Sequence, residues 1–354
     1  MQDASHILSP GGLGIFALRR QTMLSRRTPR LLAVLAVMAL AILTLITVFR
    51  GCGPVGKPEA APPEAPKTAS PAAPKTAPQV SPSNTMTDSF GRSVTISAKP
   101  ERIVSLAPSH TEVLFALGLN QQVVGVTKYC DYPAEAKQKT QVGGYSDPSV
   151  EKIVALKPDL VLADSMHKTI VEQLESLKIP VLAIEAKTIG AIPDLIEITG
   201  KASGRAEEGR ALATSLRREM ESIATRTRGL DEKGRPRIYY ELWHDPLMSV
   251  GPGSYLHDLI VLAGGTNIMA GAKSAYPLAS VEVILKADPQ VIIYCHGQQK
   301  KEDIAKRPGW GKLTAVKNGR IVLFPDENIF MRSGPRIAQA LKDLAQILHP
   351  DLFK

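Results

Sequence analysis

The chain has 354 residues, 44% of them hydrophobic, and a formal net charge of +9. This length and apolar content allow two domains with buried cores. Seven lysines and arginines but only one acid lie in residues 1–58, so most of the net charge belongs to this leader and the remaining sequence does not favour nucleic-acid binding.

Residues 1–30 form a basic leader that precedes a long, uncharged and mostly apolar run from Leu31 to Phe49. About 20 such residues span a bilayer, and arginines before the run keep that side cytoplasmic. We therefore expect residues 31–50 to be a retained membrane anchor or an export signal, with the following chain outside the cytoplasm. Cys52 lies in a sequence that resembles a bacterial lipoprotein cleavage site, so lipidation of Cys52 and an uncleaved helix are alternatives.

Residues 53–85 contain nine of the 27 prolines, together with Ala, Lys, Ser and Thr. This composition cannot bury a core, and it predicts an extended, disordered tether. At ~3.1 Å per residue the tether reaches on the order of 100 Å. The folded part is therefore expected to work near a membrane rather than within it.

In residues 86–204, short apolar runs alternate with helical patterns. Strands are predicted at Ser93–Ser97, Ile103–Leu106, Val123–Thr127, Leu160–Ala163 and Val181–Ile184. Helices are predicted from Pro108 to Gly118, with Ser109 or Thr111 as N-cap, and at Val150–Leu156 and Ile170–Leu177. This alternation predicts a three-layer α/β lobe with a parallel sheet and right-handed crossovers.

A long helix is predicted over Ala206–Thr227, within a connecting segment of residues 205–229. Its apolar stripe consists of Leu212, Leu216, Met220 and Ile223. The segments Ser149–Ala163 and Ser280–Tyr294, on either side of this helix, share Ser, Val, Glu, Ile and Pro at one constant offset. We therefore expect residues 230–354 to form a second lobe that is similar to the first.

Polar and aromatic residues follow several predicted strands. In parallel sheets, ligands bind beyond the carboxyl ends of the strands. Four of the seven histidines occupy this position, namely His110, His167, His244 and His296. An exposed loop histidine is the alternative for any one of them, but together they favour a binding site. Because imidazoles suit Zn, Co, Fe and Cu, a directly bound metal ion is a further alternative.

Five segments resemble a known family. They are Glu101–Glu112, Tyr129–Pro133, Val150–Val161, Ala263–Ile268 and Arg332–Arg336. In this order around a single helix they resemble the substrate-binding proteins of bacterial ABC importers for cobalamin, haem and ferric siderophores, most closely the cobalamin binders. The resemblance covers residues 99–350. It implies two three-layer lobes joined by one rigid helix, and a monomer that delivers a ligand to a permease dimer with ATPase subunits.

The strand-end rule and the resemblance together indicate the residues that contact the ligand. These are His110, Tyr129, His167, Trp243, His244, Tyr276, His296 and Arg332. Flat aromatic faces suit a large ring, and the resemblance implies that this ligand is a corrinoid or another metal-bearing macrocycle, with no intrinsic cofactor. Asp164 and Ala183 stand where the cobalamin binder has aromatic residues, which departs from the family pattern.

The resemblance also implies one acidic docking residue for the permease on each lobe. Glu282 matches the position in the second lobe. In the first lobe the aligned position reads Lys168, whereas Glu151 is the counterpart of Glu282 in the internal repeat. Either glutamate could instead interact only with the dipole of its own helix.

Two other classes of function remain open at this point. An enzyme would use Cys130 or Cys295–His296 as its nucleophile, but adjacent residues on a strand point to opposite faces, which disfavours the pair. A disulfide between Cys130 and Cys295 is not expected, because it would lock the cleft. A purely structural envelope protein would bind no ligand.

Overall fold

The computed structural model describes residues 83–295 and 299–354. The predicted leader, the membrane segment, Cys52 and His296 lie outside these ranges. Within them, no helix is both long and apolar enough to cross a membrane.

Folded structure begins before residue 86, the predicted boundary. Strand β1 (Ser83–Thr87) pairs antiparallel with β2 (Ser93–Ser97). The end of the predicted tether is therefore ordered, because alternate residues of β1 are half-buried and Met86 packs against the core.

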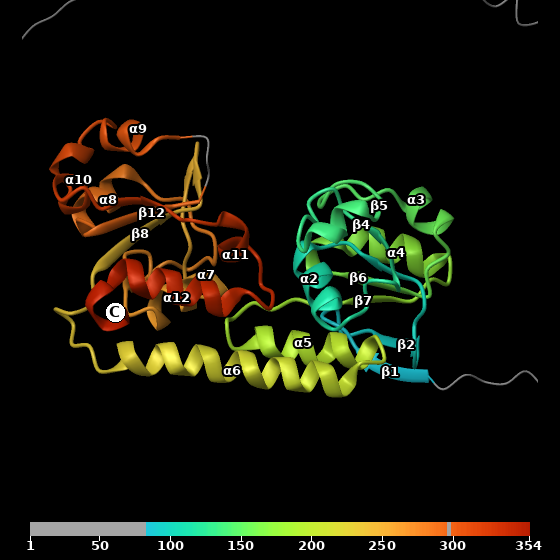
Figure 1. Ribbon diagram of the computed structural model, residues 1–354. Helices are drawn as coiled ribbons and strands as arrows, with labels where there is room; N and C mark the ends of the chain where they lie inside the picture. Colours follow the sequence, from blue (N-terminus) through green and yellow to red (C-terminus); the bar gives the residue numbers. More distant parts are fainter. Residues whose placement is uncertain (1–82, 296–298) are drawn as a thin grey trace, which may run out of the picture. The chain divides into compact units, whose positions relative to one another are not determined.

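The first lobe is built on a parallel sheet with strand order β5-β4-β3-β6-β7 (Figure 1). Its strands are β3 (Ile103–Ser105), β4 (Val123–Val126), β5 (Thr140–Gln141), β6 (Leu160–Ala163) and β7 (Val181–Ala183). Its helices are α2 (Pro108–Ala116), η1 (Ala134–Gln138), α3 (Val150–Ala155), η2 (Ser165–His167) and α4 (Lys168–Ser176). Successive side chains of β6 join two different apolar clusters, one with α2 and the other with α3 and α4. Both faces of the sheet are thus covered, as parallel sheets require.

The second lobe repeats this plan on a four-stranded parallel sheet with the order β11-β8-β12-β13. Its strands are β8 (Arg237–Glu241), β11 (Thr266–Asn267), β12 (Val291–Tyr294) and β13 (Ile321–Leu323). Its helices are α7 (Tyr255–Leu262), α8 (Val281–Ala287), α9 (Lys301–Ala305), η3 (Trp310–Lys312), α10 (Thr314–Lys317), α11 (Glu327–Met331), α12 (Ile337–Leu348) and η4 (Pro350–Phe353). Helices α7 and α12 cover one face, and α8, α9 and η3 cover the other. The predicted α/β fold with two parallel-sheet lobes is confirmed.

Two helices connect the lobes, α5 (Ala191–Ala202) and the long α6 (Ala206–Arg228), which runs beneath both in Figure 1. The helices approach closely where Gly200 meets Gly209, since a Cβ atom on Gly200 would lie 2.9 Å from the Cα atom of Gly209. Helix α6 also packs against α7 and α12. The largest apolar cluster therefore runs from the first lobe, through this helix pair, into the second.

The internal repeat corresponds to equivalent structure in the two lobes. Ser149 caps α3 by accepting a hydrogen bond from the backbone N–H of Lys152, and Ser280 caps α8 in the same way with Val283. Each helix leads into a central, fully buried strand of its sheet.

Two local predictions were wrong. The N-cap of α2 is Ala107, not Ser109 or Thr111, because Pro108 occupies the first helical turn and fixes the start of the helix. Trp243 and His244, which we predicted to contact the ligand from a loop after a strand, form strand β9, which pairs with β10 (Leu247–Met248).

Candidate functional site

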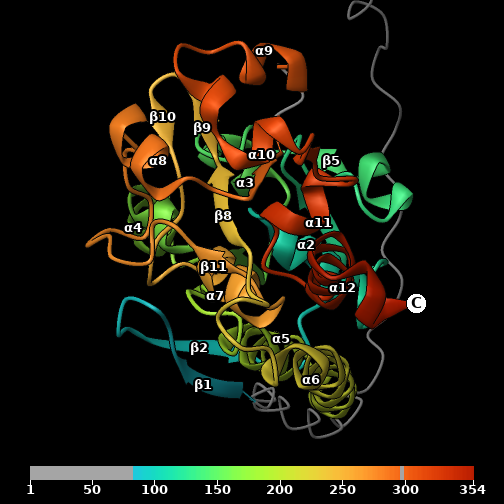
Figure 2. The ribbon, with the colours of Figure 1, turned by 90° about the vertical axis from the view of Figure 1, so that its left-hand side faces the viewer.

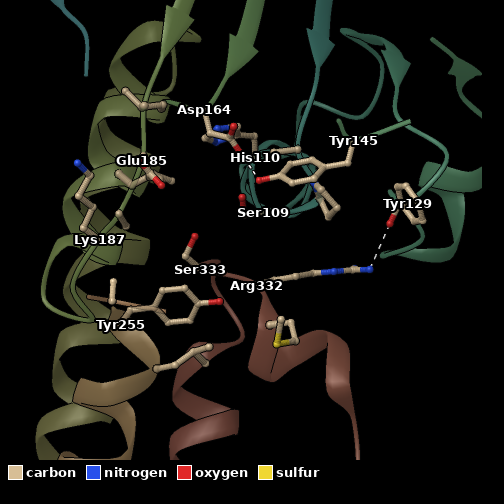
Figure 3. Close-up of a pocket in the computed structure, with 18 of the residues that line it drawn as sticks. Ser109, His110, Tyr129, Tyr145, Asp164, Glu185, Lys187, Tyr255, Arg332 and Ser333 are labelled. Carbon is tan, nitrogen blue, oxygen red and sulfur yellow. Dashed lines mark hydrogen bonds between the residues drawn. The ribbon is translucent and has the colours of Figure 1, made fainter. Parts of the chain in front are cut away.

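A cavity of about 860 Å³ is lined by residues from both lobes. The first lobe supplies residues that follow its strands, and the second lobe supplies residues around α7, α11 and the loop before α8. The polar and aromatic lining residues are Ser109, His110, Tyr129, Tyr145, Ser146, Asp164, Glu185, Lys187, Tyr255, Tyr276, Asn328, Arg332 and Ser333. Figure 3 labels ten of these residues around the cavity.

The structure brings four of the predicted ligand contacts into this lining, namely His110, Tyr129, Tyr276 and Arg332. His167 lies behind the wall rather than in it, with 2% of its surface exposed. Trp243 and His244 do not line the cavity. They belong to the β9–β10 hairpin, where they pair with Met248 and Leu247. We predicted that His167, Trp243 and His244 contact the ligand, but none of the three lines the cavity in this structure. His296 lies outside the described residues.

Sequence reasoning missed several lining residues, above all Tyr145, Glu185 and Lys187. Asp164 directly follows β6, and Glu185 closely follows β7. The strand-end rule that we applied to histidines would have found both carboxylates if it had been applied to every polar residue. Tyr145 had no such signal, since it follows a loop after the short strand β5.

Two tyrosines from different lobes present ring surface at the cavity. Tyr129 is 52% exposed and Tyr276 is 48% exposed. The ammonium group of Lys128 lies over the Tyr129 ring, 5.1 Å from its centroid, and covers one of its faces. The remaining surface of both rings is available to cover a flat, apolar ligand.

Asp164 is held in place by a compact hydrogen-bond cluster (Figure 3). The Tyr145 hydroxyl donates to its Oδ2 atom at 2.5 Å, and Nδ1 of His167 lies 2.9 Å from Oδ1. Nε2 of His167 donates to the backbone carbonyl oxygen of Tyr145 at 2.6 Å. Nδ1 also accepts a longer hydrogen bond, at 3.2 Å, from the backbone N–H of Asp164. Since Nε2 faces a carbonyl oxygen and the closest atom to Nδ1 is a carboxylate oxygen, the arrangement favours an imidazolium beside an ionised Asp164.

The pKa shifts in this cluster agree with that assignment. Burial alone raises the pKa of Asp164, but the hydrogen bond and charge of His167, with the Tyr145 hydroxyl, bring it below its ordinary value. Burial lowers the pKa of His167, but the hydrogen bond and charge of Asp164 raise it above the ordinary value. Burial, reinforced by the charge of Asp164, raises the pKa of Tyr145, so its phenol keeps its proton.

The Asp164–His167 pair makes stability depend on pH. The contribution of Asp164 is complete above 3.8, the ordinary pKa of aspartate, and that of His167 is complete below 6.5, the ordinary pKa of histidine. In that window we expect His167→Gln to lower the free energy of unfolding by about 1.5–3 kcal/mol, since it removes hydrogen bonds to charged groups. The loss should shrink as pH rises through the raised pKa of His167, and as pH falls through the lowered pKa of Asp164.

Urea denaturation of both forms at a series of pH values measures this loss. His257→Gln is the control, because the His257 imidazole has no carboxylate partner among the residues that the structure describes. A difference between wild type and His167→Gln that stays constant across these pH values would contradict the ion pair.

His110 presents a neutral imidazole. Its side chain lies in α2, is only 1% exposed, and places Nε2 at 3.1 Å from the carbonyl oxygen of Ala163. Burial lowers its pKa. Within residues 83–295 and 299–354, no group of three or more His, Cys, Asp and Glu side chains is arranged to hold a metal ion.

Next to the cavity, a buried carboxylate joins the lobes. Glu112 of α2, with 2% of its side chain exposed, accepts hydrogen bonds from Arg332 at 3.0 Å and from Arg336 at 2.9 and 2.7 Å. Arg332 also pairs with Asp131 at 2.7 Å, and the Arg336 guanidinium lies 3.8 Å from the centroid of the Tyr132 ring. Arg332 therefore lines the cavity while its charge is compensated from the first lobe.

The two cysteines within the described ranges are free thiols buried in separate lobes. Cys130 is hydrogen-bonded to Thr111 and Thr127, and burial raises its pKa. Burial raises the pKa of Cys295 to about 12. Because the thiolate is the nucleophile, both are poorly suited to covalent catalysis.

The two predicted docking glutamates are exposed and occupy equivalent positions. Glu151 lies in the first turn of α3 and Glu282 in the first turn of α8. Their role in docking stays a prediction.

Comparison with known proteins supplies context for this geometry. The profile of a family described as periplasmic binding protein matches residues 103–328. A vitamin B12-binding protein of Salmonella typhimurium is 34% identical over 70% of the chain and 90% of its own length. An uncharacterized ABC transporter substrate-binding lipoprotein of Bacillus subtilis is 32% identical over 76% of the chain and 87% of its own length.

Two solved structures share the fold. The vitamin B12-binding protein of Vibrio cholerae is 29% identical, with a TM-score of 0.61, over 71% of this chain and 97% of that one. A haem-binding protein of Roseiflexus in apo form is 26% identical, with a TM-score of 0.65, over 72% and 99%.

Proposed function

The chain belongs to the periplasmic binding protein family and is the substrate-binding component of an ABC importer, and from this we propose that it captures a corrinoid between its two lobes. The observation that carries the proposal is the pair of half-exposed tyrosines, one from each lobe, at a single cavity of about 860 Å³. Ligand pockets span roughly 300–1,000 Å³, so this one is large enough to enclose much of a macrocycle. Relatives named vitamin B12-binding proteins support the same ligand class.

Capture would involve modest closure of the lobes about a stiff support. The paired helices α5 and α6 share the apolar cluster of both lobes, and Glu112 links the lobes beside the cavity. This construction favours a preformed cleft, which reduces the ordering cost of binding.

Delivery would require docking on a permease dimer that is served by ATPase subunits. We propose Glu282 and Glu151 as the acidic docking residues, because they are exposed at equivalent places on the two lobes. The relatives are periplasmic or lipoprotein binding proteins. We further propose that this chain works as a monomer on the outer side of the cytoplasmic membrane, tethered through residues 31–50 or a lipid on Cys52.

Haem or a ferric siderophore is the second candidate ligand, supported by the haem-binding structure with the same fold. A directly bound metal ion has weaker support, because the described histidines do not converge. Catalysis by cysteine is disfavoured by the protonated, buried thiols.

Titration of the full chain with hydroxocobalamin tests the proposal. A ligand that binds only the native state stabilises it by about 2.7 kcal/mol when present at 100 times Kd. We therefore expect a higher Tm and a visible absorbance band that stays with the protein through gel filtration. Haemin serves as the comparison: a shift with haemin and none with hydroxocobalamin would replace the corrinoid with the second candidate.

A further inference from the structure

One wall of the cavity carries two carboxylates and a phenolic oxygen that acts as a hydrogen-bond acceptor. It is formed by Tyr145, Asp164 and Glu185 of the first lobe, all three of which line the cavity (Figure 3). We call these three residues the acceptor wall. Asp164 is the best ordered of them, because Tyr145, His167 and the backbone N–H of Met166 all donate to its carboxylate.

The hydrogen bond made by the Tyr145 hydroxyl group determines whether Tyr145 meets a ligand as a donor or as an acceptor. Its single hydroxyl proton is donated to Asp164, so the phenolic oxygen has only lone pairs left for a ligand. Burial and the charge of Asp164 raise the pKa of Tyr145, which keeps this arrangement in place. A carboxylate accepts and does not donate when it is ionised. Asp164 and Tyr145 therefore both face the ligand as acceptors.

Glu185 extends this surface toward the second lobe. Its side chain is exposed, and it forms no ion pair with any residue in the part of the chain that the structure describes. Its charge contributes to raising the pKa of both Tyr145 and Tyr276, after the larger effect of burial, which places it near both rings.

The cationic side chains near the cavity do not neutralise the acceptor wall on the side that faces the ligand. His167 compensates the charge of Asp164 from behind, and both of its ring nitrogens are already engaged. Arg332 is committed to Glu112 and Asp131. In Figure 3 the ammonium group of Lys187 points away from Tyr145 and Asp164. A ligand carboxylate at the wall would meet two carboxylates, and the donors beside it in the first lobe are the uncharged hydroxyl groups of Ser109 and Ser146.

We infer that the acceptor wall selects ligands that present N–H donors, such as primary amides, and rejects ligands that place a carboxylate there. The inference rests on the proposed function and narrows it to macrocycles whose peripheral side chains are amides. Tyr145 and His167 act as positioning residues that hold the Asp164 carboxylate, and Asp164 itself contacts the ligand.

The test compares ligands that differ by one functional group. Cyanocobalamin and its three separated monoacids, in each of which one propionamide is hydrolysed to propionate, are titrated into the full chain. We expect at least one monoacid to bind about tenfold to a hundredfold more weakly than the parent compound, because an amide N–H to a charged acceptor is replaced by repulsion.

Asp164→Asn keeps the shape of the side chain but offers an amide donor, so it should reduce this ratio severalfold. Glu185→Gln is a second variant at an exposed position, which keeps the test available if the buried change impairs folding. Glu172→Gln is the matched control, since it neutralises an exposed carboxylate on α4 that does not line the cavity.

The outcomes separate this inference from the proposed function. Tight binding of cyanocobalamin with equal affinity for all monoacids would overturn the acceptor wall alone. So would discrimination that neither Asp164→Asn nor Glu185→Gln alters. If the protein binds haemin instead of cyanocobalamin, the corrinoid proposal falls, and the wall still predicts weaker binding of haemin than of its bis-amide. Binding of no macrocycle would overturn both.

Discussion

Glu112→Ala is expected to lower the free energy of unfolding by about 3–5 kcal/mol, the cost of removing one partner from a buried ion pair. The Glu112 carboxylate accepts three hydrogen bonds from two arginines of the other lobe. Both guanidiniums are largely buried, with 10% and 20% of their side chains exposed. The residual contacts of Arg332 with Asp131 and of Arg336 with Asp326 place the expected loss toward the lower end of this range.

Urea denaturation measures the effect, and Glu221→Ala provides the control. Glu221 pairs with Arg228 on the surface of α6, where 59% of the glutamate and 64% of the arginine side chain are exposed. An exposed pair of this kind contributes about 0–1 kcal/mol. Glu112→Gln keeps the shape of the side chain and should fall between the two. Equal midpoints for Glu112→Ala and Glu221→Ala would show that Glu112 does not hold the lobes together.

Tyr129→Ala combined with Tyr276→Ala is expected to weaken corrinoid binding by between about a hundredfold and a thousandfold. About half of each side chain is exposed, and covering it buries on the order of 60–80 Å² of ring surface. At ~25 cal/mol per Å² this contributes roughly 1.5–2 kcal/mol for each ring, and each 1.4 kcal/mol is about tenfold in affinity. Since both side chains are half-exposed, the double variant should retain its fold.

The matched control is Tyr129→Phe with Tyr276→Phe, which keeps both flat faces and removes only the hydroxyl groups. Isothermal titration with hydroxocobalamin should give nearly wild-type affinity for this control. If the phenylalanine and alanine pairs weaken binding equally, the hydroxyl groups rather than the ring faces bind the ligand. If neither pair changes the affinity, the ligand lies elsewhere.

Most of the secondary structure could be predicted from the local pattern of apolar and polar residues in the sequence. The stripe formed by Leu216, Met220 and Ile223 has the period of a helix with one buried face, and these side chains are buried along α6. The repeated segments were recognised in the sequence, and the structure shows that the serine that begins each of them caps a helix, α3 or α8. Two local predictions failed. Pro108 starts α2, so its N-cap is Ala107 rather than Ser109 or Thr111, and Trp243 pairs with β10 in a hairpin.

The candidate site was predictable only in part. His110, Tyr129, Tyr276 and Arg332 line the cavity, whereas His167 supports it from behind. A residue that follows a strand is placed at the binding edge by topology, but the direction of its side chain is decided by what it contacts. His167 turns toward Asp164 and Tyr145, and no sequence pattern reports that choice.

The amino-acid sequence by itself determined the α/β class, the alternation of elements, the long connecting helix and the family. These features depend on the spacing of apolar residues and on short motifs, and both are local properties of the sequence. The acceptor wall and the link between lobes were decided by tertiary structure alone. Arg332 and Glu112 are separated by 220 residues, and contacts of that range exist only after both sheets have formed and the lobes have packed on α5 and α6.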